Sequence, residues 1–180
     1  AKPFQLRVAL AALNGAVAAA LPLPLLAVGA SSHSGEDVHV RAVRDVLRVL
    51  CVDEGDLACG AEAPLHQPAA HDLLRQQRQF SAVHNDCSGK HAFMLGACAA
   101  RGWPLRRGAY LHQHHQLQRR IVAYVNGVLR GGGGSGGGDG SVSDGGGGNE
   151  HCRSGGIGDC GGSGRVHGVG VDGCGVPTLA

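Results

Sequence analysis

The sequence predicts a domain that mixes helices with short strands, of the α+β or α/β class. Apolar residues recur at helical spacing in three segments, 37–50, 89–100 and 115–130. Over 165–171, apolar and other residues alternate with a period of two, which is typical of a short strand. The order of these elements alone does not select a topology.

The segment 37–50 is the clearest amphipathic helix. Its apolar face, which we expect in the core, consists of Val40, Val43, Val46, Leu47 and Leu50. Ser34 is the expected N-cap, with Asp37 three residues on as a weak capping box. A second set at helical spacing is basic and is expected to form a solvated face: Arg41, Arg44 and Arg48.

The other two helices end at glycines. The segment 89–100 places Phe93, Met94, Ala97 and Cys98 on one face and stops at Gly102. Ser88 is its expected N-cap, because its hydroxyl could accept the amide of His91. The segment 115–130 carries Leu117, Ile121, Val125 and Val128, and a glycine run follows it directly.

The composition limits the size of the domain and the kinds of partner that we expect. The chain has 180 residues, enough for one domain with a real core, and only 3% are aromatic, so Ala, Val and Leu must build that core. A net charge of +2 gives no support for nucleic acid or membrane partners. The apolar stretch 9–30 is a poor membrane span because Asn14, Gly15, Pro22 and Pro24 interrupt it.

Cysteine usage suggests a reducing compartment. The chain has 7 cysteines, an odd number, and no leader segment is recognisable, so we expect reduced thiols and a cytoplasmic location. Cys51 and Cys98 lie on apolar helical faces and are expected to be small core residues.

Three regions are expected along the chain. Residues 1–130 look like a globular core. Residues 131–164 look like a flexible insertion, because more than half of them are Gly and almost none can bury apolar area. Residues 165–180 would supply a strand and the turn Asp172-Gly173-Cys174-Gly175, which would complete a site with the core.

The segment 84–91 concentrates reactive groups: it reads His84-Asn85-Asp86-Cys87-Ser88-Gly89-Lys90-His91. A cysteine just before a helix favours a thiolate, because the free amides and the helix dipole stabilise negative charge. Lys90, three residues on, could pair with that thiolate or share a zinc ion with it. An inert buried thiol in a capped first turn explains the pattern equally well.

A second polar segment reads Ser31-Ser32-His33-Ser34-Gly35-Glu36. One of its hydroxyls could be a nucleophile if a base lies nearby. Pattern alone favours the plainer interpretation, in which Ser34 caps the next helix and the other residues form a turn.

These motifs occur in an order that resembles the L-asparaginase II family, of the rhizobial type. The resemblance rests on Lys2-Pro3-Phe4-Gln5, Ala30-Ser31-Ser32-His33-Ser34-Gly35-Glu36 with His39, Cys59-Gly60, Asn85-Asp86-Cys87-Ser88-Gly89-Lys90-His91, His115 with Gln118, and Asp172-Gly173-Cys174-Gly175-Val176-Pro177.

The resemblance implies a fold similar to serine β-lactamases and glutaminases, an α+β sandwich. It also implies hydrolysis of L-asparagine to L-aspartate and ammonia through a serine acyl-enzyme. The implied partners are a small-molecule substrate and a second copy in a homodimer, with no nucleic acid and no membrane.

The resemblance also implies roles for single residues. Lys2 matches the lysine of a Ser-x-x-Lys pair, whose serine would lie three residues earlier. Ser32 matches the serine of a second pair, with Ser31 as the alternative register, and the lysine of that pair would lie beyond Ala180. The zinc ligands would be Cys87, Lys90 and Cys174, and the substrate pocket would include His91 and Asp172.

Some positions depart from the family pattern. Asp86 stands where an Asn is usual, Phe93 where a Gly is usual, and Gln116 where a Pro is usual. With the missing serine, these departures lead us to expect a fragment that does not act on asparagine by itself. The alternative function is a non-catalytic, zinc-binding protein of the same fold.

Overall fold

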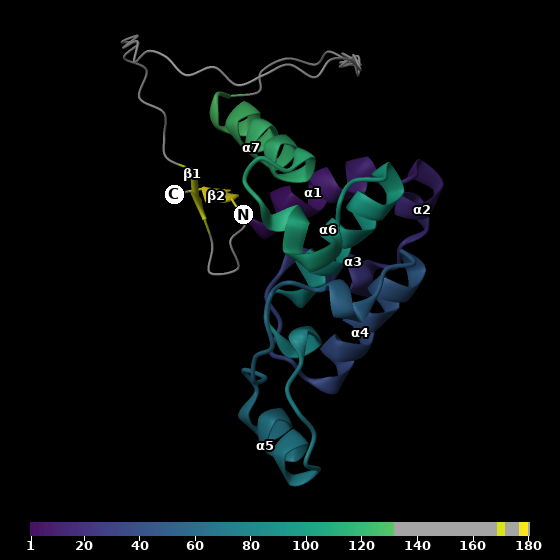
Figure 1. Cartoon of the computed structure of the whole chain (residues 1–180), viewed down its shortest axis with the longest axis vertical. Helices are drawn as coiled ribbons and strands as arrows, with labels where there is room; N and C mark the ends of the chain where they lie inside the picture. The colour runs from purple at the N-terminus through teal and green to yellow at the C-terminus, as the bar shows by residue number, and fades with distance from the viewer. Residues whose placement is uncertain (132–168, 172–176, 180) are drawn as a thin grey trace, which may run out of the picture.

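The computed structural model describes residues 1–131, 169–171 and 177–179. Its helices and strands are α1 (Lys2–Ala12), α2 (Gly15–Ala20), α3 (Leu23–Ala30), α4 (Asp37–Val49), α5 (Gln67–Arg75), α6 (Ser88–Arg101), α7 (Gln116–Leu129), β1 (Val169–Val171) and β2 (Pro177–Leu179). Three short 3₁₀ helices connect them: η1 (Glu54–Asp56), η2 (Ala82–His84) and η3 (Arg106–Leu111). Figure 1 shows α5 at the far end of the molecule from α7.

The expected α+β sandwich is wrong for the described part of the chain. That part is helical, and its strands are limited to one antiparallel pair of three residues each, β1 and β2. The sandwich was implied by resemblance and not by the local pattern. Apolar residues in 1–131 recur at helical spacing, and the one alternating segment that we identified lies at 165–171.

Helix α6 lies at the centre of the helical core. Every residue from Ser88 to Cys98 is buried, and the helix packs against α1, α3, α4 and α7 (Figure 1). The expected apolar face is therefore confirmed, but the opposite face is buried as well. A helix that is covered on all sides can hold polar groups only where neighbouring elements satisfy them.

Helices α3 and α6 approach each other very closely at Gly89. A Cβ atom on Gly89 would lie 2.0 Å from the carbonyl oxygen of Val28, so only glycine fits there. This contact sets the end of α3 against the start of α6. As a result, the residues that follow α3 and those that precede α6 meet.

The predicted helices occur, but two predicted caps are wrong. The expected core residues of α4 are buried, and its arginines, Arg41, Arg44 and Arg48, are exposed. However, Glu36 is the N-cap of α4, and Ser34 Oγ donates to the carboxylate of Glu36 at 2.7 Å. Cys87, not Ser88, is the N-cap of α6. Gly102 ends α6 in the left-handed conformation, as expected.

One of the two cysteines that we expected in the core is buried, and the other is not. Cys98 is fully buried, whereas Cys51 is exposed, with φ at +54°, because it lies in the turn after α4 rather than on the helix. The apolar stretch 9–30 is divided among α1, α2 and α3, and within the described residues no helix could span a membrane.

The predicted insertion lies outside the described residues from position 132 onward, so its flexibility stays a prediction. The predicted strand at 165–171 agrees with β1 over its last three residues. In the antiparallel pair of β1 and β2, Val169 lies opposite Leu179 and Val171 lies opposite Pro177. The turn that connects the two strands, with Asp172 and Cys174, lies outside the described residues.

Candidate active site

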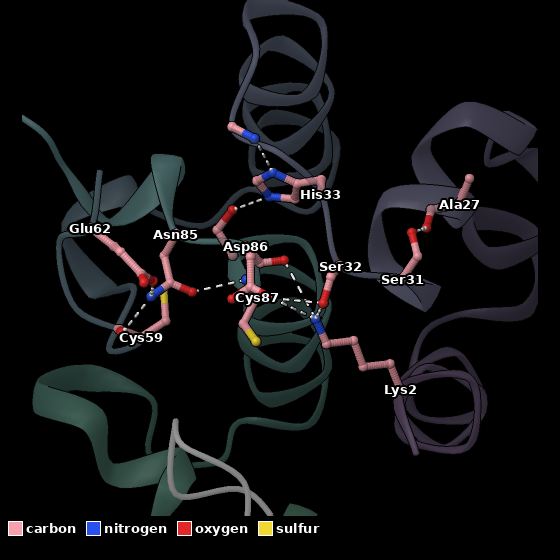
Figure 2. A network of polar contacts seen from close by, with 12 residues as sticks. Lys2, Ala27, Ser31, Ser32, His33, Cys59, Glu62, Asn85, Asp86 and Cys87 are labelled. Carbon is pink, nitrogen blue, oxygen red and sulfur yellow. Dashed lines mark hydrogen bonds and ion pairs between the residues drawn. The ribbon is translucent and has the colours of Figure 1, made fainter. Parts of the chain in front are cut away.

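Lys2 lies on the first turn of α1, and its amine reaches residues from two distant segments. Its Nζ atom is 2.5 Å from Ser32 Oγ, and it forms an ion pair at 3.5 Å with the carboxylate Oδ2 of Asp86 (Figure 2). The Lys2 side chain is only 19% exposed. Partial burial strengthens such contacts relative to those of a fully exposed pair.

Two serines follow α3, and their hydroxyls differ in what they contact. Ser31 Oγ donates to the carbonyl of Ala27 at 2.8 Å, which closes the last turn of α3. Ser32 Oγ donates to Asp86 Oδ2 at 2.7 Å. Figure 2 shows Ser31 directed away from Lys2 and Ser32 directed toward it. Of the two registers left open by the sequence, the geometry therefore favours Ser32.

Asp86 lies in the turn between η2 and α6, where it meets both partners. Burial alone would raise the pKa of its carboxyl, but hydrogen bonds with Ser32 and Cys87 and the charge of Lys2 together hold that pKa below its ordinary value. The Asp86 backbone carbonyl also accepts the amide of His33 at 3.2 Å, next to Ser32. Asp86 is thus charged at neutral pH and fixed against the segment that carries Ser32.

His33 is buried and belongs to a separate, satisfied network. The Gly35 amide donates to Nδ1 at 3.2 Å, so the ring proton lies on Nε2, which donates to Ser88 Oγ at 2.8 Å. Ser88 in turn donates to the carbonyl of Val83 at 3.0 Å. Burial, followed by the charge of His39, lowers the pKa of His33 to about 4. Both ring nitrogens of His33 are therefore engaged, and Ser88 is fully buried with its proton bonded to a carbonyl, so neither residue is placed to act in catalysis.

Asn85 ties the loop at residues 59–62 to the start of α6. Its amide donates to the Cys59 carbonyl at 3.1 Å and to the Glu62 carboxylate at 2.8 Å, and its carbonyl accepts the Cys87 amide at 2.8 Å (Figure 2). The position of Cys87 therefore depends on a side chain that sequence reasoning did not single out. The Asn85-Asp86 dipeptide within the motif was the only signal for it.

The first turn of α6 holds the other predicted site residues. Cys87 is 9% exposed, Lys90 is 1% exposed and His91 is fully buried. Tyr110 Oη accepts the Ala58 amide at 2.9 Å and forms a hydrogen bond with His91 Nδ1, also at 2.9 Å. Tyr110 thereby fixes the orientation of the His91 ring, a role that the sequence did not indicate.

Cys59 lies near the same cluster. Burial is the main cause that raises the pKa of its thiol to about 12, with a further contribution from Cys87. A thiol with so high a pKa stays protonated at neutral pH, and it donates to the Ala82 carbonyl. Cys59 is therefore a structural residue rather than a nucleophile.

The predicted zinc site is only partly described. Among the residues that the structure describes, no three His, Cys, Asp or Glu side chains gather closely enough to hold a metal ion. Cys87 is the N-cap of α6 and Lys90 lies on its first turn, but the third predicted ligand, Cys174, and the pocket residue Asp172 fall outside the described residues. The zinc assignment remains a prediction.

Comparison with known families identifies the chain. Residues 1–140 match the family model described as L-asparaginase II. The chain belongs to this family. A search among curated proteins found no match. The matched range contains Lys2, Ser32 and Asp86, so the cluster that the packing brings together lies inside the part of the chain that defines an asparaginase II protein. Membership makes the chain an asparaginase-type amidohydrolase with a small-molecule substrate.

Proposed function

We propose that this asparaginase II protein hydrolyses the side-chain amide of L-asparagine to give L-aspartate and ammonia, through a serine ester. The observation that supports this most directly is the contact of Lys2 Nζ with Ser32 Oγ, which joins residues from α1 and from the segment after α3. An amine beside a serine hydroxyl is the equipment that acyl transfer requires, because it can move a proton and stabilise an oxygen anion.

The chemistry has two halves. In the first, a serine oxygen attacks the amide carbon, the C–N bond breaks, and ammonia leaves with a proton from the site. In the second, water hydrolyses the ester and releases aspartate. Lys2 supplies a proton donor in both halves, and Ser32 lies within its reach. The partial exposure of Lys2 and Asp86 leaves room for a small substrate to approach.

Zinc is the cofactor that this proposal includes. The donors are a thiol, an amine and a second thiol from Cys87, Lys90 and Cys174, which are ligand types that zinc accepts. The ion would orient the substrate rather than supply a hydroxide, because a serine is the nucleophile. Asp172 would hold the α-ammonium of the substrate, and His91 would line the pocket.

Release of ammonia from L-asparagine tests the proposal. The sequence alone led us to expect no action on asparagine, but the contact of Lys2 with Ser32 supplies a serine in place of the missing one. We therefore propose that the purified protein releases ammonia and aspartate in equal amounts, with a decrease of at least about 100-fold in the Lys2→Met variant, since proton transfer is lost. L-Glutamine serves as the comparison substrate. Absence of turnover in a folded, zinc-loaded protein would refute the asparaginase assignment.

A further inference from the structure

We propose that the groove between α1 and α7 binds a small organic anion, which places its acid group between Arg7 and Arg120 and its apolar part against the groove lining. The inference does not depend on the proposed function, because the groove is separate from the cluster around Lys2. Five positions along α1 separate Lys2 from Arg7, which corresponds to a rotation of about 140° around the helix, so their side chains leave α1 on different faces.

The groove has the size and the lining of a small-molecule site. Helices α1 and α7 pack against each other (Figure 1), and together they line a groove of about 360 Å³. This volume lies in the range that is usual for ligand pockets. Apolar lining comes from Val8 and Ala12, which are buried, and from Ala123 and the ring of Tyr124, which are exposed. An apolar body the size of two fused rings fits this space.

Two arginines on facing helices line the same groove. Arg7 comes from α1 and Arg120 from α7, and both side chains are exposed. The guanidinium carbon of Arg120 lies 5.4 Å from the centroid of the Trp103 ring, a cation–π contact that restricts the side chain. A guanidinium presents paired N–H donors that match a carboxylate or a phosphate. An acid group in the groove would therefore meet a positioned cation on one side and a second cation on the other.

Acidic residues are absent from the stretches that build this part of the molecule. Residues 1–35 and 87–131, which form α1, α2, α3, α6 and α7, contain no Asp or Glu. Within the described residues, the arginines that form ion pairs lie on α4 and α5, so Arg7 and Arg120 are not among them. Like charges beside one groove repel each other, and a bound anion would remove that repulsion.

A third arginine neutralises the end of α1 beside the groove. The last carbonyls of a helix carry partial negative charge, which would oppose an anion. The Arg101 guanidinium donates to the carbonyl of Ala12 at 2.8 Å and to that of Ala11 at 3.2 Å, and both alanines line the groove. The negative end of α1 is thereby covered by a cation, so the groove favours a negatively charged ligand.

Isothermal titration calorimetry of the full chain with 2-naphthoate tests the site. This probe carries one carboxylate on an apolar body, and 2-naphthamide is its neutral counterpart of the same shape. We expect one 2-naphthoate to bind per chain with a dissociation constant of about 1 mM or lower, and 2-naphthamide to bind at least about tenfold more weakly. Inorganic phosphate alone should also bind at least about tenfold more weakly, because it leaves the apolar lining unused.

Matched variants locate the probe on the protein. Arg7→Gln and Arg120→Gln should each weaken the binding of 2-naphthoate by at least about fivefold, because each loses a charged hydrogen-bond donor. Arg119→Gln removes the same charge from the same helix but outside the described groove lining, so the dissociation constant should stay within about twofold. Ala123→Leu keeps every charge and fills the groove from an exposed position, so it should weaken binding by at least about fivefold and leave the circular dichroism spectrum unchanged.

Three results would overturn the inference: no binding of 2-naphthoate, equal binding of 2-naphthoate and 2-naphthamide, or equal losses in Arg119→Gln and Arg120→Gln. A single-stranded RNA oligonucleotide is the control for a general basic surface. We expect no RNA binding at about 150 mM salt. RNA that binds more tightly than 2-naphthoate, with equal losses in the same two variants, would assign this face to nucleic acid and remove the small-anion site.

Discussion

Single residues in this protein gain their roles from partners that lie far away in sequence. Asp86 is 84 residues from Lys2 and 54 residues from Ser32, yet it bonds to both. The family resemblance predicted that Lys2 and Ser32 belong to a site, but it assigned them to two separate pairs. Their contact depends on how α1, α3 and α6 pack, and no local pattern in the sequence encodes that distance.

His33 shows how burial decides the state of one residue and links it to stability. Its pKa is about 4 in the folded chain, against an ordinary value of 6.5, mainly because burial disfavours the charged ring. As pH falls from about 6.5 to about 4, the unfolded chain takes up a proton that the folded chain does not. The free energy of unfolding should therefore fall by about 3 kcal/mol over this range.

Urea unfolding at a series of pH values measures this effect. In His33→Gln the slope of stability against pH between about 6.5 and 4 should be reduced, whatever the absolute stability of the variant. His84 and His115 also have lowered pKa values and will contribute a smaller slope of the same sign in both proteins. An unchanged slope in the variant would show that His33 is not the group that titrates.

Helices were the elements that sequence analysis predicted best. Periodicity identified α4, α6 and α7, because burial of one face follows directly from the spacing of apolar side chains. The caps were predicted poorly. Ser34 and Ser88 have the right chemistry for caps, but tertiary partners take their hydroxyls instead: Glu36 for Ser34, and the Val83 carbonyl with His33 for Ser88.

The contact between α3 and α6 yields a prediction at the scale of elements. Gly89→Ala should destabilise the protein by about 3 kcal/mol, because the added methyl would collide with the Val28 carbonyl and push the helices apart. Separation of the helices would also move Ser32 away from Asp86, so turnover of L-asparagine should decrease together with stability.

Gly127 provides the matched control for this substitution. It lies in the interior of α7, and a Cβ on it would meet nothing within 4 Å. Gly127→Ala should therefore stabilise the protein by about 0.5–1 kcal/mol. If both variants unfold at the same urea concentration, α3 and α6 do not depend on close packing at Gly89.

At the scale of the whole molecule, the sequence predicted the overall arrangement less well than it predicted the single helices. The helical core around α6 was recognisable from hydrophobic spacing, whereas the sandwich implied by resemblance does not occur in the described residues. Family membership was predicted correctly, because short motifs such as residues 85–91 lie within the range that the family model matches.

The central claim is that packing of α1, α3 and α6 creates an acyl-transfer site at Ser32. The most direct measurement is the initial rate of ammonia release from L-asparagine by two neighbouring variants, Ser32→Ala and Ser31→Ala, each checked by circular dichroism to be folded. The account predicts that Ser32→Ala loses at least about 100-fold in rate and that Ser31→Ala stays within about twofold of the unmodified protein. Equal rates in the two variants, or a larger loss in Ser31→Ala, would contradict it.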